Sequence, residues 1–213
     1  MKWSRVVKGT APTSGTYRDW KPQLATEGGH RCVYCCIPEG AFGGLRNFHV
    51  EHLRPKSLYR HLENTYGNLF FACAVCNSFK GDDWIEVASL PPTKPCYPDP
   101  SVTDYAYVFS VSYSDGRVAG TCVAGDYLVE RLFLNRPQLV VERRLSNMGV
   151  RLSAELKLVE DALAKALSPG ASTGVRKKAV ALLRRTTKLS VLVAGYSKVV
   201  PYGAADLRRP DSS

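Results

Sequence analysis

The chain has 213 residues, of which 45% are hydrophobic and 23% charged, with a formal net charge of +10. That composition excludes a collagen-like or disordered chain and is sufficient to bury a core. The longest apolar runs are too short to cross a bilayer and residues 1–5 lead into no apolar signal segment, so we expect a cytoplasmic protein without membrane association. Seven cysteines, an odd number, favour reduced thiols or metal ligands over a disulfide framework.

The first hundred residues divide into an irregular N-terminal segment, 1–30, and a compact block, 31–100, that is dense in Cys, His and Asn. The expected elements are a short helix at about 18–26, strands at 47–51 and 68–72, and a helix from Asn77 onward that carries Trp84, Ile85 and Val87. A Pro-rich connector over 91–100 closes the block, because proline supplies no donor to a strand ladder.

Residues 101–213 are expected to form a β-hairpin followed by a helical, basic lobe. Residues 105–113 alternate large and small side chains, which predicts a half-buried strand that Asp115 and Gly116 turn back into 118–123. The expected helices span about 126–135, Pro137 to about 167, and about 173–194. Two stripes at helical spacing predict the buried faces of the last two helices: Val141, Leu145, Met148, Leu152, Leu156, Val159 and Leu163, then Val175, Ala179, Leu182, Thr186, Leu189 and Val193.

The basic excess gathers towards the end of the chain. Residues 170–213 contain nine Lys or Arg and two Asp, a local charge of +7. Such a basic excess is typical of a protein that binds a polyphosphate backbone, since each phosphate that a cation neutralises releases counterions and so adds affinity. A solvated helix face gives the same pattern, so the sequence leaves both interpretations open.

Two Cys-x-x-Cys knuckles flank the first predicted strand: Cys32 with Cys35, and Cys73 with Cys76. Each tight turn points two sulfurs at one ion, so the pair predicts a structural Zn²⁺ site with four thiolates. Cys36 could replace Cys35 as a ligand, and buried thiols or a redox pair are the alternatives to zinc. A closed four-thiolate centre contributes folding free energy and no chemistry.

The segment between the knuckles carries His49, Glu51 and His52. His49 and Glu51 project from the same face of a strand, whereas His52 begins the following turn. A carboxylate can hold Mg²⁺ or Mn²⁺, and a neutral imidazole can take a proton from water near pH 7. Asn77, directly after the second knuckle, adds a neutral oxygen ligand, so the cluster predicts metal-assisted hydrolysis.

In order and spacing, this part of the chain resembles the zinc-knuckle subtype of the HNH endonucleases, which fold as a ββα-metal finger. The resemblance is carried by Cys-x-x-Cys, by His-Val-Glu-His-x-x-Pro-x-Ser and by Gly-Asn-Leu-x-x-x-Cys-x-x-Cys-Asn-x-x-Lys-Gly-Asp. It implies that Glu51, where the family usually has Asp, and Asn77 hold the catalytic metal. It further implies that His52 is the general base, that Asn68 braces the loop, and that His49 adds a ligand or contacts the scissile phosphate.

Arg54, Lys56 and Lys80 are placed to meet the flanking phosphates, although solvated surface charges would leave the same sequence. The expected fold class is therefore α+β: a zinc-bound ββα-metal finger, a β-hairpin and a helical C-terminal lobe. The expected partner is nucleic acid, with DNA favoured.

A second, looser resemblance joins Phe109–Gly116, Leu132–Leu139 and Arg143 to HNH proteins of antiphage defence operons of the Septu and retron-associated kind. Those proteins are paired with an ATPase subunit, so this resemblance implies a defence role and an ATPase partner. Two rival interpretations stay open. One is a zinc-dependent nucleic-acid-binding module without catalysis, and the other is a subunit that docks through the helix Pro137–Leu167.

Overall fold

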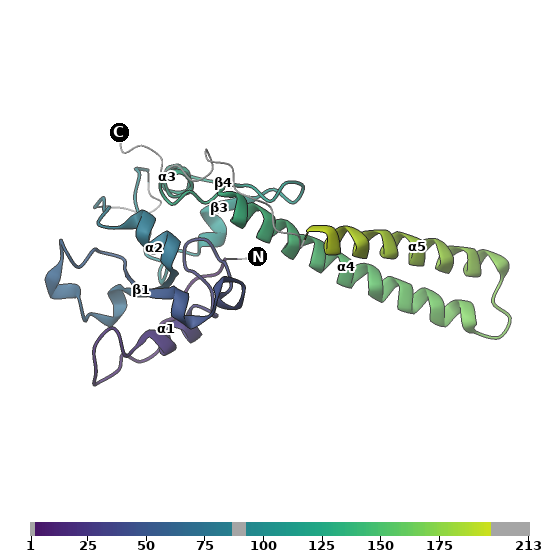
Figure 1. Ribbon diagram of the computed structural model, residues 1–213, viewed down its shortest axis with the longest axis horizontal. Coiled ribbons are helices and arrows are strands. Elements are labelled where there is room, and N and C mark those ends of the chain that lie inside the picture. The colour runs from purple at the N-terminus through teal and green to yellow at the C-terminus, as the bar shows by residue number, and fades with distance from the viewer. Residues whose placement is uncertain (1–2, 87–92, 197–213) are drawn as a thin grey trace.

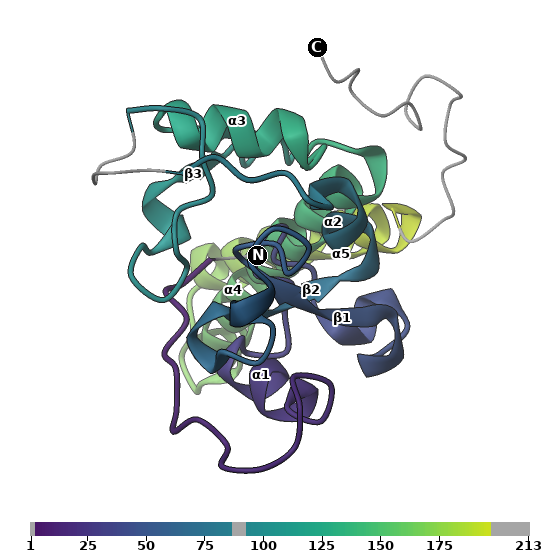
Figure 2. The same cartoon turned by 90° about the vertical axis from the view of Figure 1, so that its left-hand side faces the viewer.

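A computed structural model describes residues 3–86 and 93–196. In those residues it is α+β, as expected, with five α-helices and two small antiparallel sheets. The described residues before the middle of α4 (Pro137–Leu167) gather into one body, and the rest of α4 leaves it with α5 (Thr173–Tyr196) as a long helical hairpin (Figure 1). Turned by 90°, the view shows the body in front of that hairpin (Figure 2).

The first sheet pairs β1 (Phe48–His52) with β2 (Leu69–Cys73), and both strands lie one residue later than predicted. Their antiparallel register sets His52 opposite Leu69. All five β2 residues are buried, and α1 (Lys21–Glu27) packs against this strand. The apolar side chains of β2 therefore fix the strand pair in the core, and β1 carries the polar residues at its edge.

The helix after β2 begins earlier than predicted. α2 spans Ala74–Lys80 rather than starting at Asn77, because the Cys73 sulfur accepts a hydrogen bond from the Cys76 amide and caps the helix. It ends at Gly81, whose φ of 54° lies in the left-handed region that favours glycine. Trp84 and Ile85 therefore follow the helix, while Val87 and the start of the Pro-rich connector lie outside the described residues.

The second sheet is shorter than its alternating pattern predicted. β3 (Phe109–Val111) pairs with β4 (Val118–Gly120), but residues 105–107 form a 3₁₀ turn. The Asp104 carboxylate caps that turn by accepting a backbone amide, which competes with an extended conformation. Tyr107 is consequently 81% exposed, so alternation over nine residues overestimated the strand.

α3 (Val123–Arg131) follows β4 directly and begins three residues before the expected Asp126. The close approach of β4 and α3 depends on glycine. A Cβ at Gly120 would collide with the Asp126 amide, and one at Gly125 would collide with the Val108 carbonyl. The hairpin and α3 are therefore locked together as one unit.

The long helix α4 begins at Pro137, as predicted, but most of its apolar stripe is not buried. Val159 is buried, whereas Leu156 is 47% exposed and Leu163 is 37% exposed. The physical reason is that the outer half of α4 leaves the body and packs against α5. On α5 the predicted stripe does face α4's side of the hairpin, since Ala179 and Thr186 are buried.

One hydrophobic cluster extends from Trp3 to Leu139 and joins the N-terminal segment, the first sheet and the second sheet. The expected unit boundaries at residues 30 and 100 stay predictions. In the part of the chain that the structure describes, no helix has the length and apolar character needed to cross a bilayer. Three basic residues of the tail, Lys198, Arg208 and Arg209, lie outside the described residues.

Candidate functional site

Four cysteines meet inside the body where β2 passes into α2. The sulfurs of Cys32, Cys35, Cys73 and Cys76 all lie within 4.8 Å of one another, and those of Cys35 and Cys73 are 3.8 Å apart. A tetrahedron with Zn–S bonds of about 2.3 Å places its sulfurs about 3.8 Å apart, so the cluster has the size that zinc requires. Cys35 belongs to this group and Cys36 does not.

A buried guanidinium lies against this cluster. Four thiolates around Zn²⁺ carry a net charge of −2, and Arg136 brings its Nη2 to 3.4 Å from the Cys76 sulfur and 3.9 Å from the Cys73 sulfur. Its Nη1 donates to the carbonyls of Leu132 and Phe133, which hold the side chain in place. Sequence reasoning missed Arg136, because it lies sixty residues beyond Cys76 and only the fold brings the two together.

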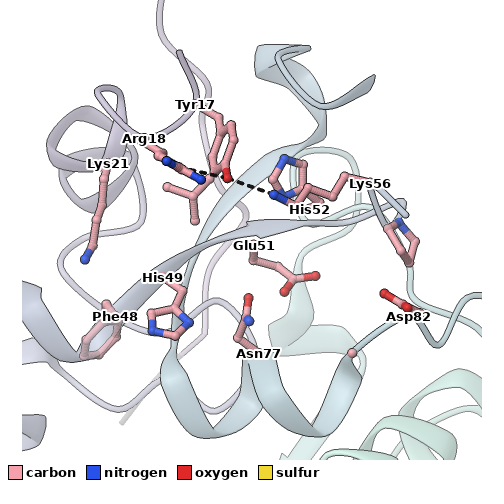
Figure 3. Close-up of a pocket in the computed structure, with 13 residues that line it drawn as sticks. Tyr17, Arg18, Lys21, Phe48, His49, Glu51, His52, Lys56, Asn77 and Asp82 are labelled. Atoms are coloured by element: carbon pink, nitrogen blue, oxygen red, sulfur yellow. Dashed lines mark hydrogen bonds between the residues drawn. The ribbon is translucent and has the colours of Figure 1, made fainter. Parts of the chain in front are cut away.

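A pocket of about 420 Å³ opens beside β1 (Figure 3). It brings together four of the predicted catalytic residues: His49, Glu51, His52 and Asn77. Figure 3 shows His49, Glu51 and Asn77 on one side of β1, as the strand period predicted, and His52 on the other side. The side chains of Glu51 and Asn77, which carry oxygen atoms that could bind a metal, and the His49 imidazole therefore lie on one side of the strand, and the His52 imidazole lies on the other.

Glu51 is 3% exposed and forms a buried ion pair. Its Oε1 is 2.9 Å from the Lys80 ammonium and accepts a hydrogen bond of 3.1 Å from the Tyr34 hydroxyl. Burial raises the pKa of the Glu51 carboxyl above its ordinary value, and Lys80 opposes that rise. Because both contacts involve Oε1, the second oxygen remains as the candidate metal ligand beside Asn77.

Lys80 differs from the sequence prediction. Its side chain is fully buried, and the ammonium donates to the His52 carbonyl oxygen at 3.1 Å as well as pairing with Glu51. It also lies 5.2 Å from the centre of the Tyr97 ring. A buried and paired ammonium does not reach a phosphate, so Lys80 is an internal partner of Glu51 and not a nucleic-acid contact.

The His52 imidazole is fixed by one hydrogen bond and by contact with one aromatic ring. Its Nε2 is 2.9 Å from the Glu63 carbonyl oxygen, which can only accept, so Nε2 carries the hydrogen and Nδ1 is the acceptor. The Tyr17 ring packs edge-on at 4.8 Å between centroids. Burial lowers the pKa of His52 below the ordinary 6.5, although the bond to Glu63 opposes this. The imidazole is therefore neutral at pH 7.

Asn68 lies behind the turn that follows β1 rather than in the pocket. Its Oδ1 accepts the Arg54 amide at 2.8 Å, and its Nδ2 donates to the Arg54 carbonyl at 3.0 Å. The Asn68 carbonyl also accepts the Leu53 amide at 2.9 Å. These bonds fix the backbone immediately after His52, so Asn68 has the geometry of a brace.

The two remaining predicted cations lie near the rim. Lys56 lines the pocket, is about half exposed, donates to the Tyr17 hydroxyl at 2.8 Å and pairs with the Glu63 carboxylate at 3.3 Å. Arg54 is also about half exposed but turns to Glu86, 3.3 Å away, and to the Trp84 ring. Lys56 is therefore placed to meet a ligand in the pocket, and Arg54 lies beside it.

Sequence reasoning missed four residues that line the pocket: Tyr17, Arg18, Lys21 and Asp82. Three of them belong to the N-terminal segment, 1–30, where no sequence motif indicates a functional residue. The Tyr17 hydroxyl accepts from both Lys56 and Arg18, and these bonds lower its pKa below the ordinary value. Asp82 stood in the quoted motif, and Figure 3 shows its carboxylate across from Glu51.

Comparison with known proteins adds one finding. Residues 32–83 match a family model described as HNH endonuclease, which covers 52 of the 213 residues. The match begins at the first cysteine of the cluster and ends three residues after Lys80. Among curated proteins, none matches the chain.

Proposed function

We propose that the HNH endonuclease domain formed by residues 32–83 hydrolyses phosphodiester bonds in nucleic acid, that it does so with a divalent metal ion, and that DNA is its substrate. The observation that carries this proposal is the placement of His52. Its Nε2 lies 2.9 Å from the Glu63 carbonyl oxygen, burial lowers its pKa below the ordinary value, and it borders the pocket that also holds Glu51 and Asn77. A non-catalytic binding module gives no reason for that arrangement.

His52 would act as the general base. Nδ1 takes a proton from water, the water oxygen forms a bond to phosphorus, and the bond from phosphorus to the 3′ oxygen breaks. The leaving 3′ oxygen takes a proton from solvent water, and the imidazolium later returns its proton to solvent, so the products are a 5′-phosphate and a 3′-hydroxyl. The carbonyl of Glu63 supports this step, because it orients the ring and stabilises the imidazolium that forms.

The second oxygen of Glu51 and the amide oxygen of Asn77 are the proposed ligands of Mg²⁺ or Mn²⁺, with His49 and Asp82 close by in the pocket. A bound divalent ion would offset the negative charge that grows on the scissile phosphate and the leaving oxygen. Lys80 keeps Glu51 ionised at the position where it is needed, since an unpaired carboxylate would take up a proton in that buried place.

The cations on the His52 side of the pocket are proposed to hold the substrate. Arg18 and Lys56 both donate to the Tyr17 hydroxyl, which keeps two positive charges beside the general base. Phosphates that flank the scissile bond would meet these charges and be oriented for attack. Arg54 is a further proposed contact, whereas Lys80 is not.

The four-cysteine cluster is proposed to bind a structural zinc ion. Such a closed centre has no open ligand position, so its contribution is to hold the turn after α1 against β2 and α2. This fixes Asn77, one residue after Cys76, relative to β1. Zinc thus supports the geometry of the pocket without entering the reaction.

A role in antiphage defence, in the cytoplasm and with an ATPase partner, is a further proposal. What supports it is the resemblance of residues 109–143 to defence-associated HNH proteins. A phage challenge of cells that carry the chain, with His52→Ala as the inactive comparison, tests the role. Co-purification of an ATPase from the host that encodes the chain tests the partner.

The proposed activity is tested with the purified full chain on three substrates of similar length: supercoiled plasmid, circular single-stranded DNA and structured RNA. We expect nicking of the plasmid when Mg²⁺ or Mn²⁺ is added and none without added divalent ion. DNA ligase should reseal the nicks, because the ends carry 5′-phosphate and 3′-hydroxyl. Cleavage that needs no divalent ion, or nicks that the ligase rejects, would contradict the proposed chemistry.

A further inference from the structure

α5 is a basic helix in a hairpin that is otherwise close to neutral. Its 24 residues contain six Lys or Arg and no acidic residue, whereas α4 contains five basic and four acidic residues. Figure 1 shows α5 lying along α4 away from the body. The charge is therefore concentrated on one element, and that element does not border the pocket beside β1.

Three of the six cations of α5 lie on the face turned away from α4. Ala179 and Thr186 are buried on the side towards α4, and at 100° per residue Lys177, Arg184 and Lys188 fall on the opposite side. These three side chains are exposed, and among the described residues none of the three takes part in an ion pair. We call Lys177, Arg184 and Lys188 the outer basic face of α5.

Arg185 shows the contrast within the same helix. It lies nearer the α4 side and forms a two-pronged contact with the Glu155 carboxylate, with Nε 2.9 Å from Oε2. Its charge is thus used to hold the hairpin together. The cations of the outer basic face form no such ion pair among the described residues. Repulsion between them therefore lowers the folding stability, and no attractive contact of the face offsets that cost.

The shape of the outer basic face fits a nucleic-acid backbone. Lys177 and Arg184 of this face line a shallow groove of about 390 Å³ together with Thr173, Arg176, Val180 and Ala181. A helix of 24 residues is about 36 Å long, close to one turn of a B-form duplex.

We propose that the outer basic face of α5 binds the phosphate backbone of a double-stranded nucleic acid, as a sequence-independent contact remote from the pocket. This rests on the proposed function in one respect, namely that the duplex is the substrate of the nuclease. A second copy of the chain is a poor occupant, because it would set two helices of +6 against each other. A straight, rigid row of charges instead matches the regular phosphates of a duplex.

The test measures binding of the full chain to a labelled 30-base-pair duplex without added divalent ions, so that no cleavage is required. One variant reverses three charges of the face, as Lys177→Glu, Arg184→Glu and Lys188→Glu. The matched control reverses three exposed charges of α4, as Arg151→Glu, Lys157→Glu and Lys165→Glu. Both variants change the net charge by the same amount within the same hairpin.

We expect the α5 variant to bind roughly 100-fold or more weakly at 0.1 M salt and to lower the magnitude of the slope of log K against log salt by about 3. The α4 control should lose only a small fraction of that affinity. Circular dichroism and zinc content check that both variants fold. If the reversals unfold α5, the glutamine version of the same three changes replaces them, with a smaller loss expected.

Equal losses in the α5 and α4 variants would overturn the proposal, because net charge alone would then explain binding. Absence of duplex binding by the unchanged chain would overturn it too, and an equal α5 dependence with a single strand of the same length would overturn the choice of a duplex. Since the measurement involves neither hydrolysis nor His52, a chain that binds through α5 but does not cleave would contradict only the proposed function.

Discussion

Replacing Lys80 with methionine should destabilise the protein by about 3–5 kcal/mol, because the change leaves the Glu51 carboxylate buried without its partner. The two groups are 2.9 Å apart, and their side chains are 1% and 4% exposed. At an effective dielectric constant of 20, two unit charges at that distance attract by on the order of 6 kcal/mol. In the intact pair, the cost of burying both charges offsets most of this attraction. In Lys80→Met the attraction is lost, but the cost of burying the Glu51 carboxylate remains.

The pH dependence of this loss follows from the Glu51 carboxyl. Burial already raises its pKa in the folded protein, and removal of the ammonium raises it further. A carboxyl with a raised pKa in the folded state binds protons more tightly there, so stability falls as pH rises through that pKa. The difference between the unchanged chain and Lys80→Met should therefore grow as pH rises from the ordinary pKa of a glutamate, and it should be larger at pH 8 than at pH 5.

Urea denaturation at the two pH values measures this difference, with equal zinc content as the control. The second change Glu51→Gln, made in the Lys80→Met background, should recover part of the loss, because it removes the unpaired charge and keeps an acceptor for Tyr34. A loss below 1 kcal/mol, or one that does not vary with pH, would show that the pair is not the buried contact described above.

Three further predictions follow from other contacts. Arg136→Gln should release zinc to a chelator at least tenfold faster than Arg151→Gln, since it removes a charged donor worth about 1.5–3 kcal/mol beside the Cys76 sulfur; equal release rates would contradict this. Asn68→Ala should cost about 1–3 kcal/mol in urea denaturation and lower the cleavage rate, because two backbone groups lose their partners; an unchanged rate would argue against a brace. The cleavage rate should fall as pH drops through the pKa of His52, below the ordinary 6.5, since the base must be neutral; an acid limb above 6.5 would be inconsistent with the burial of that ring.

The sequence was most informative where chemistry demands fixed spacing. Two Cys-x-x-Cys turns predicted a four-cysteine cluster, and Cys32, Cys35, Cys73 and Cys76 do meet. The two strands around the histidines were predicted to within one residue, because their apolar runs are short and bounded by polar turns. Local patterns of this kind need no knowledge of the rest of the fold.

Predictions failed where a long-range contact or a cap decides the outcome. Lys80 reads as a surface charge, yet α2 carries it under β1 to the Glu51 carboxylate. A sulfur cap at Cys73 starts α2 three residues early, and the Asp104 cap replaces a predicted strand by a 3₁₀ turn. The stripe of α4 has helical spacing regardless of what covers it, so periodicity could not show that Leu156 would be half exposed.

The pocket also depends on residues that no motif marks. Tyr17 reaches His52 and Lys56, and Arg18 reaches Tyr17, because α1 packs the N-terminal segment against the first sheet. Arg136 reaches the cysteine cluster because the turn between α3 and α4 passes over it. Both are products of tertiary packing and could not be predicted from one sequence.

The central claim, that His52 is the base of a phosphodiester hydrolase, is tested most directly by the initial rate of plasmid nicking in Mg²⁺ for the unchanged chain, His52→Ala and His61→Ala. His61 is the matched control, since it is exposed and does not line the pocket. We predict that His52→Ala loses at least 100-fold in rate with unchanged folding and zinc content, whereas His61→Ala retains the rate. Comparable rates for His52→Ala and the unchanged chain would contradict the account.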